Sequence, residues 1–170
     1  MRFYDVNSGE ILVDGHNIKD FKRGDLRKMF GMVLQDTWLF GGTVKENIKY
    51  GKPEASDSEV IEAAKAAHVH HFIKTLPNGY NSVLNEESSN VSAGQKQLLT
   101  IARVILADPK ILILDEATSN IDIVTENKIS NAFNKLIKNS TSFIIAHRLS
   151  TIKNADKIIF IENGNIIEEG

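Results

Sequence analysis

Cysteine is absent from the 170 residues, which excludes disulfide bridges, cysteine-ligated zinc, iron–sulfur clusters and thiol catalysis. An excess of one charge is also lacking, since 20 Lys+Arg face 22 Asp+Glu. No basic surplus exists to neutralise phosphates, so we expect no nucleic-acid partner. No apolar stretch approaches the roughly 20 residues that span a bilayer, and the N-terminus lacks the pattern of a signal peptide. The composition therefore indicates one soluble, cytoplasmic α/β domain.

Two hairpins are predicted near the ends of the chain. Asp14-Gly15 separates the apolar runs 10–13 and 16–18, and Asn163-Gly164 separates 157–161 from 166–168. Asp-Gly and Asn-Gly between apolar runs favour two-residue β-turns, so both hairpins should be antiparallel.

Between the hairpins the pattern alternates between strands and helices. Apolar runs predict buried strands of a mostly parallel sheet at Gly31–Leu34, Ile111–Leu114 and Phe143–Ala146. The four consecutive apolar residues of Ile111–Leu114 are typical of a parallel strand covered on both faces. Helical spacing predicts helices over Ser58–Lys74, Ser92–Ala107 and a third that carries Ile129–Ile137. Ser56 with Glu59 has the spacing of a capping box. The last strand, helix and strand should form a right-handed parallel βαβ unit.

Polar residues follow each of the three predicted strands. They are Gln35, the pair Asp115-Glu116, and His147. Because ligands of open α/β sheets bind beyond the carboxyl ends of the strands, these residues should converge on one site.

Asp115 and Glu116 are the strongest candidates for chemistry. A carboxylate at the end of an apolar strand is costly to desolvate unless it binds a cation or hydrogen-bond donors. In nucleotide hydrolases such an Asp holds Mg²⁺ and the following Glu can act as general base. The alternative is that both carboxylates cap the following loop and helix.

Val91–Gln95 offers a second candidate site. The start of a helix presents free N–H groups and a positive dipole end, which attract a phosphate, and Ala93 and Gly94 leave the backbone uncovered. Ser92 and Gln95 also have capping-box spacing, so a well-formed helix start explains them equally.

The remaining polar and aromatic candidates are ambiguous. His147 could hydrogen-bond a phosphate and hold Glu116, or be structural. We expect His68, His70 and His71 to lie near the C-terminal end of a helix, where positive charge is favourable, rather than to form a metal site. Trp38 and Phe40 are either core residues or part of a docking surface.

In combination, these segments closely resemble the nucleotide-binding domain of ABC transporters. VSAGQKQLLTIAR is followed directly by ILILDEATSNID and later by AHRLSTIKNAD, and the resemblance covers nearly the whole chain. QDTWLFGGTVKENIKYG and IIFIENGNIIEEG resemble the exporter subfamily. The resemblance implies a P-loop NTPase-like fold with a helical subdomain from about 52 or 55 to 107, and a domain attached to a transmembrane part at the cytoplasmic face of the membrane.

The resemblance also implies roles for single residues, with ATP and Mg²⁺ as cofactors. Gln35 matches the Q-loop glutamine, which contacts Mg²⁺ and the water. Asp115 matches the Walker B aspartate, Glu116 the catalytic glutamate and His147 the switch histidine. The signature motif matches Ser92, Ala93, Gly94 and Gln95, the D-loop aspartate matches Asp122, and the glutamate that touches coupling helices matches Glu86.

Two departures from the family pattern bear on function. The signature has Val91 and Ala93 where Leu and Gly are usual, which resembles one half of a heterodimeric exporter with unequal ATP sites. The P-loop sequence G-x-x-x-x-G-K-[ST] does not occur, because the single Gly-Lys pair, Gly51-Lys52, is followed by Pro53. The chain is therefore expected to be truncated at both ends, without the P-loop strand and helix, and inactive alone.

Three functional hypotheses follow. The leading one is the ATP-hydrolysing domain of an exporter, paired head to tail with a second nucleotide-binding domain and touching the transmembrane domain near Gln35 and Glu86. The second is a catalytically silent module that presents its signature to a partner. The third, a soluble ABC ATPase of the DNA-repair or translation type, is disfavoured by the charge balance.

Overall fold

A computed structural model describes residues 1–85, 90–115, 121–138, 140–145 and 155–170. Its centre is a parallel sheet with the strand order β3-β6-β7. The strands are β3 (Phe30–Val33), β6 (Ile111–Asp115) and β7 (Thr141–Ile145). Both pairings are parallel, and α6 (Ile123–Ile137) connects β6 to β7. The predicted βαβ unit is confirmed.

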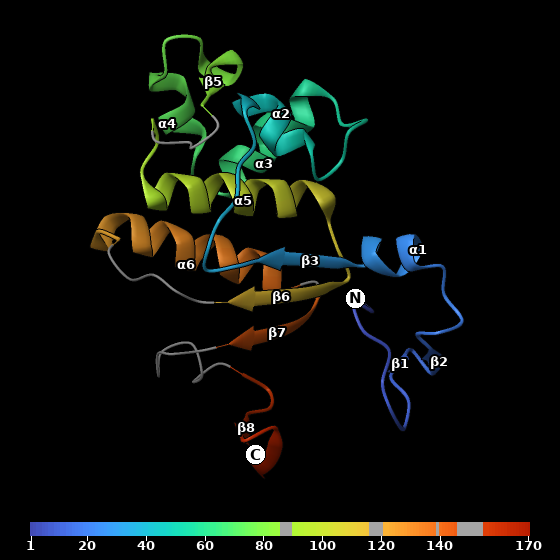
Figure 1. The fold of residues 1–170 in the computed structure, drawn as a ribbon. Helices are drawn as coiled ribbons and strands as arrows, with labels where there is room; N and C mark the ends of the chain where they lie inside the picture. Colours follow the sequence, from blue (N-terminus) through green and yellow to red (C-terminus); the bar gives the residue numbers. More distant parts are fainter. Residues whose placement is uncertain (86–89, 116–120, 139, 146–154) are drawn as a thin grey trace.

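The helices form two layers on one side of this sheet (Figure 1). The layer next to the sheet consists of α5 (Ala93–Ala107) and α6, and the outer layer consists of α2 (Val44–Lys49), α3 (Asp57–Ala66) and α4 (His70–Thr75). Residues of both helix layers and of β3 and β6 share one hydrophobic core. The expected helical region thus holds α3, α4, the short 3₁₀ helix η1 (Gly79–Asn81) and α5.

The strands are less covered than their apolar sequences suggest. Burial alternates along β6, where Leu112 and Leu114 are buried and Ile113 is only half-buried. Along β7 the exposure is larger, with Phe143 60% and Ile145 51% exposed. The described helices lie against one face of the sheet only, so the burial expected for the strand at Phe143–Ala146 is wrong for Phe143 and Ile145.

The expected helix over Ser58–Lys74 is two helices, and this prediction is corrected. Its start is right, since Ser56 and Glu59 form the capping box of α3. The helix ends because His68 takes a left-handed conformation with φ of 58°. The N–H of Val69 then donates to the carbonyl of Ala64, and that of His68 to Lys65, at 2.9 and 3.0 Å. These two bonds form a Schellman motif, which terminates a helix even where apolar spacing continues.

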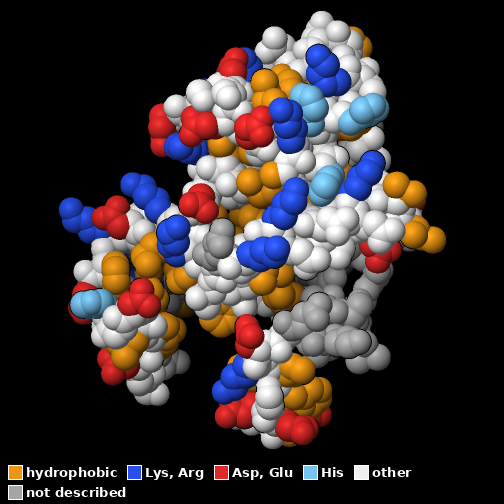
Figure 2. Space-filling model, turned by 180° about the vertical axis from the view of Figure 1, so that it is seen from behind, with side chains coloured by type: hydrophobic (Ala, Val, Ile, Leu, Met, Phe, Trp, Pro, Cys, Tyr) orange, Lys and Arg blue, Asp and Glu red, His pale blue; other side chains and the backbone are white. Residues whose placement is uncertain are grey.

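Both predicted terminal hairpins are present and antiparallel. The first joins β1 (Leu12–Val13) to β2 (His16–Asn17), and the second joins β8 (Ile159–Glu162) to β9 (Asn165–Glu169). Each turn has two residues with positive φ, as a type I′ turn requires. Apolar side chains of the second hairpin lie on the surface (Figure 2), among them Phe160 and Ile161.

Three further elements complete the described fold. They are the helix α1 (Arg23–Lys28) and the antiparallel pair β4 (Gly42–Thr43) and β5 (Val83–Leu84). In the described ranges, no helix is long and apolar enough to cross a lipid bilayer.

Candidate functional site

One edge of the molecule gathers the carboxyl ends of all three parallel strands and the N-termini of two helices. The arrowheads of β3, β6 and β7 point to the side from which α5 and α6 begin (Figure 1). Main-chain N–H groups in the first turn of a helix lack acceptors within the helix and carry its positive dipole end. The helix starts on this side can therefore bind an anion, and Asp115 ends the middle strand of the sheet on the same side.

Asp115 and Gln35 lie on adjoining strands at this edge. Asp115 is the last residue of β6 and is half-buried, whereas Gln35 is exposed two residues beyond β3. Because Val33 is paired with Leu114, the chain segments that carry both side chains leave the sheet next to each other. The predicted convergence of these two residues is consistent with this register.

The start of α5 is capped as its sequence predicts. Ser92 Oγ accepts from the N–H of Gln95 at 3.3 Å, and Gln95 Oε1 accepts from the N–H of Ser92 at 2.8 Å. The cap leaves the N–H groups of Ala93 and Gly94 in the first turn, and the Ala93 side chain is exposed. Capping and anion binding therefore use different N–H groups and are compatible.

Gly94 does not leave the backbone uncovered as we expected, and this interpretation is corrected. The residue is buried, and its Cα faces the start of α6. A Cβ added there would lie 2.5 Å from Thr125 Cγ2 and 3.3 Å from Ile121 Cγ2. Glycine at this position therefore allows α5 and α6 to approach each other at their N-termini.

Asp122 is the N-cap of α6. Its Oδ1 accepts from the N–H of Thr125 at 2.9 Å, and this main-chain hydrogen bond lowers the pKa of the carboxyl. Gly94 brings the caps of the two helices close together. Within the described ranges, no hydrogen bond or ion pair joins these caps to Asp115 or Gln35.

Three predicted site residues, Glu116, His147 and Glu86, lie outside the described residues. Among the residues that the structure covers, no group of three or more His, Asp or Glu side chains could hold a metal ion alone. His70 instead contacts Tyr80, with Nδ1 2.8 Å from the phenolic oxygen, and burial raises the pKa of Tyr80 to about 12.

Sequence reasoning missed one polar network. Arg103, on α5, donates to Asn47 on α2 and to the main chain of Trp38, which is 62% exposed. The sequence held one signal for it, because Arg103 is the single charged residue between Leu98 and Ala107. Nothing in the sequence indicated where its partners lie.

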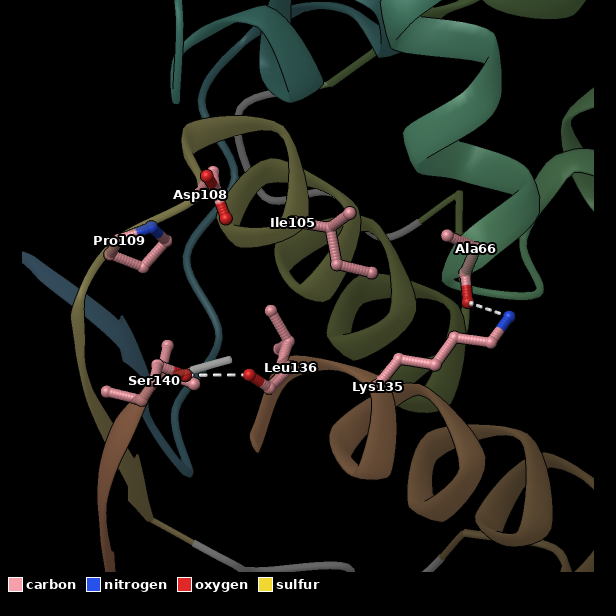
Figure 3. Close-up of a pocket in the computed structure, with 8 residues that line it drawn as sticks. Ala66, Ile105, Asp108, Pro109, Lys135, Leu136 and Ser140 are labelled. Carbon is pink, nitrogen blue, oxygen red and sulfur yellow. Dashed lines mark hydrogen bonds between the residues drawn. The ribbon is translucent and has the colours of Figure 1, made fainter. Parts of the chain in front are cut away.

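A pocket of about 170 Å³ opens at the other end of the sheet (Figure 3). Pro109 and Ser140, which precede β6 and β7, line it together with Lys135 of α6. The Lys135 ammonium donates to the carbonyl of Ala66 at 3.3 Å, and the Ser140 hydroxyl donates to that of Leu136 at 2.7 Å. Its lining contains none of the predicted site residues, so we do not place the chemistry there.

Comparison with known proteins identifies the family of this chain. Residues 1–119 match the family described as ABC transporter. Over 169 residues the chain is 57% identical to an uncharacterized ABC transporter ATP-binding protein of Bacillus subtilis. It is equally similar to an ATP-binding/permease protein of Staphylococcus aureus whose name proposes multidrug export. The matches cover 99% of the chain but only 28% and 29% of these two relatives.

A solved structure has the same fold. It is that of a bacterial Atm1-family ABC exporter with ATP bound, which superposes with a TM-score of 0.90 at 41% identity. The match covers 99% of this chain and 30% of that one. The architecture is thus that of the P-loop NTPase domain of an ABC exporter. Because the family model matches residues 1–119 of the 170, the chain belongs to the ABC transporter family.

Proposed function

We propose that this chain binds and hydrolyses ATP as part of an ABC exporter. The observation that carries the proposal is the edge where the end of β6, with Asp115, adjoins the segment of Gln35. In the same domain α5 begins with a capped signature that is exposed at Ser92 and Ala93. Family membership supports the same conclusion. The exporter assignment follows the similarity to the Atm1-family structure, whose nucleotide is ATP.

The residues at this edge fit Mg²⁺ and a phosphate. Mg²⁺ prefers oxygen ligands and is commonly held by one or two carboxylates together with the phosphates of its substrate. Asp115 offers a carboxylate and Gln35 an amide oxygen, which suits an ion that arrives with ATP. The N–H groups of Ala93 and Gly94 suit a phosphate.

The chemistry divides among the residues of this chain. Bound Mg²⁺ would supply charge that neutralises the phosphates and the leaving group. Asp115 and Gln35 hold the ion, and Glu116 accepts a proton from the attacking water as general base. His147 donates a hydrogen bond that keeps the reacting groups in place. Asp122 orders the start of α6 next to the signature.

The signature serves a second nucleotide-binding domain. In a head-to-tail pair, Ser92–Gln95 complete the ATP site whose P-loop is on the partner. The methyl group of Ala93 and its restricted backbone hold that phosphate farther from the N–H groups than Gly does. We therefore propose a heterodimer in which the site of Glu116 hydrolyses ATP, while the site completed by Ala93 mostly retains it.

The remaining contacts join this domain to the membrane. The regions of Gln35 and Glu86 face the transmembrane part, and the domain lies at the cytoplasmic face of the membrane. The name of the Staphylococcus aureus relative combines ATP-binding and permease functions, which supports this arrangement.

The test is Glu116→Gln in the complete transporter, reconstituted in lipid nanodiscs. The amide keeps the shape but cannot accept a proton, so ATP binding should persist while hydrolysis slows by ~10²- to 10⁴-fold. Glu54→Gln, a change of the same chemistry at an exposed residue, is the control.

Three outcomes would revise the proposal. Near-normal turnover of Glu116→Gln assigns the base to another residue. A wild-type protein that does not hydrolyse ATP favours a silent module that presents its signature. If mutation of the corresponding position in a partner half abolishes activity while Glu116→Gln retains it, the two sites are assigned the wrong way round.

A further inference from the structure

Arg103 is a cation held by neutral acceptors. Its Nε donates to the carbonyl of Asn47 at 2.8 Å, Nη2 to Asn47 Oδ1 at 3.2 Å, and Nη1 to the carbonyl of Trp38 at 3.2 Å. Partial burial of the guanidinium lowers its pKa, although an arginine stays charged at any physiological pH. The contact is therefore set by the fixed fork of the guanidinium rather than by an ion pair.

Asn47 links Arg103 to the segment that follows Gln35. The residue is 1% exposed, and its amide is used on both sides. Oδ1 accepts from the N–H of Phe40 at 3.1 Å, and Nδ2 donates to the carbonyls of Phe40 and Thr43 at 3.0 and 3.1 Å. One buried amide thus fixes the chain between β3 and α2 and presents it to Arg103.

Two further contacts hold the same segment on α5. The Tyr50 ring lies over the guanidinium, 5.3 Å from its carbon, and is followed by the rings of Phe40 and Trp38 at successive spacings of 5.6 and 5.9 Å. The backbone at Gly51 touches the helix itself, since a Cβ there would be 2.2 Å from the Arg103 carbonyl oxygen. The outer rings, Trp38 and Tyr50, are 62% and 63% exposed.

We propose that Arg103 is a positioning residue that makes the segment Trp38–Gly51 and the signature helix α5 move as one body. Arg103 and Ser92 are on one continuous helix, roughly 16 Å apart at 1.5 Å per residue. A displacement of the exposed Trp38 and Tyr50 rings therefore shifts the start of α5 at Ser92. This inference rests on the proposed function, in which the region of Gln35, three residues before Trp38, faces the transmembrane part and Ser92 completes an ATP site.

The experiment uses the complete transporter in nanodiscs and compares Arg103→Lys, Trp38→Ala and the double variant. Lysine keeps the charge, but its ammonium group lacks the planar fork that lets arginine donate at once to the two oxygens of Asn47 and the carbonyl of Trp38. We expect Arg103→Lys to lower kcat for ATP hydrolysis by about 3- to 30-fold, the usual range for a coupling residue, with KM for ATP changed less than about twofold. Trp38→Ala should lower kcat in the wild-type background. The double variant should have the same kcat as Arg103→Lys alone.

Arg27→Lys is the matched control. Arg27 also donates to a carbonyl, that of Met1, and lies 5.1 Å from the centre of the Phe3 ring, but it is on α1 and exposed. We expect its kcat to equal the wild-type value. A wild-type kcat for Arg103→Lys, or additive effects of Trp38→Ala and Arg103→Lys, would overturn the inference.

If Arg103→Lys does not fold, a second variant still tests the inference. Tyr50→Leu removes the ring over the guanidinium and leaves the three hydrogen bonds, so a smaller fall in kcat with the same dependence on Trp38 is expected. Additivity with Trp38→Ala would again refute the idea. ATP hydrolysis by the wild type, assayed in parallel, separates the two proposals. Its absence refutes the proposed function, whereas wild-type hydrolysis beside an unaffected Arg103→Lys refutes only the positioning role.

Discussion

Gly94→Ala is expected to destabilise the fold, because the added methyl group would force the N-termini of α5 and α6 apart. The added Cβ would meet Thr125 Cγ2 at 2.5 Å, well inside normal van der Waals contact, and Ile121 Cγ2 at 3.3 Å. Overpacking of this kind costs about 1–3 kcal/mol. An approach of 2.5 Å belongs to the upper part of that range, about 2–3 kcal/mol. Because alanine recovers up to ~1 kcal/mol over glycine in a helix, the net loss should be about 1–2 kcal/mol. For a chain of this length that corresponds to a fall in melting temperature of roughly 2–8 °C.

The assay is urea and thermal unfolding followed by circular dichroism at 222 nm. Gly24→Ala in α1 is the matched control, because an added Cβ there meets no atom within 4 Å. That substitution should stabilise by about 0.5–1 kcal/mol. The two changes have the same chemistry and opposite expected signs.

A second-site change isolates the cause. Thr125→Ser removes the methyl group that Gly94→Ala would strike, while the hydroxyl and the N–H that bonds to Asp122 remain. Gly94→Ala combined with Thr125→Ser should therefore unfold at nearly the same urea concentration as Thr125→Ser alone. If Gly94→Ala is as stable as the wild type, or if Thr125→Ser does not rescue it, the packing explanation of this glycine is refuted.

Two other predictions concern nucleotide binding and acid stability. The 170 residues alone should not bind Mg²⁺–ATP with micromolar affinity, because the lysine and main-chain N–H groups of a P-loop are not among them; a calorimetric titration decides this. The Lys52 ammonium and the main chain and hydroxyl of Ser56 lower the pKa of Glu59 from 4.5 to about 2. A lowered carboxyl pKa stabilises the fold above the unfolded value, and this contribution disappears as the pH falls from about 4.5 to about 2. The wild type should therefore exceed Glu59→Gln in urea midpoint at pH 5.5, with the gap closing near pH 2.5; a gap that does not depend on pH would contradict the assignment.

Local chemistry made several elements predictable from sequence. The boxes at Ser56 and Ser92 and the turns at Asp14-Gly15 and Asn163-Gly164 each satisfy backbone groups within a few residues, so sequence spacing predicted them. The end of α3 was missed because His68 occupies a left-handed position that glycine usually fills, and apolar spacing continues through the break.

The non-local features could not be predicted in the same way. Arg103 donates to Asn47 across 56 residues of sequence, and no sequence pattern predicts such a pairing. The burial of Gly94 depends on where α6 begins in space, which a helix-start motif does not encode. The polar residues at the ends of apolar runs nevertheless predicted that Gln35 and Asp115 lie on adjoining chain segments, because parallel strands place their carboxyl ends together.

The parallel register of the sheet has a consequence for the order of folding. Phe30 is paired with Ile111 about 80 residues later, whereas Ile111 is paired with Thr141 only about 30 residues on. Closing the two loops costs roughly 4 and 3 kcal/mol in chain entropy, so β6 and β7 should associate first around α6. Strand β3 joins afterwards, once the intervening helices have shortened its loop. Leu112→Ala should accordingly slow refolding, whereas Val33→Ala should chiefly accelerate unfolding, and comparable refolding rates for the two variants would exclude this order. The long helical insertion between β3 and β6 thus makes the strand that leads to Gln35 the last of the three to form.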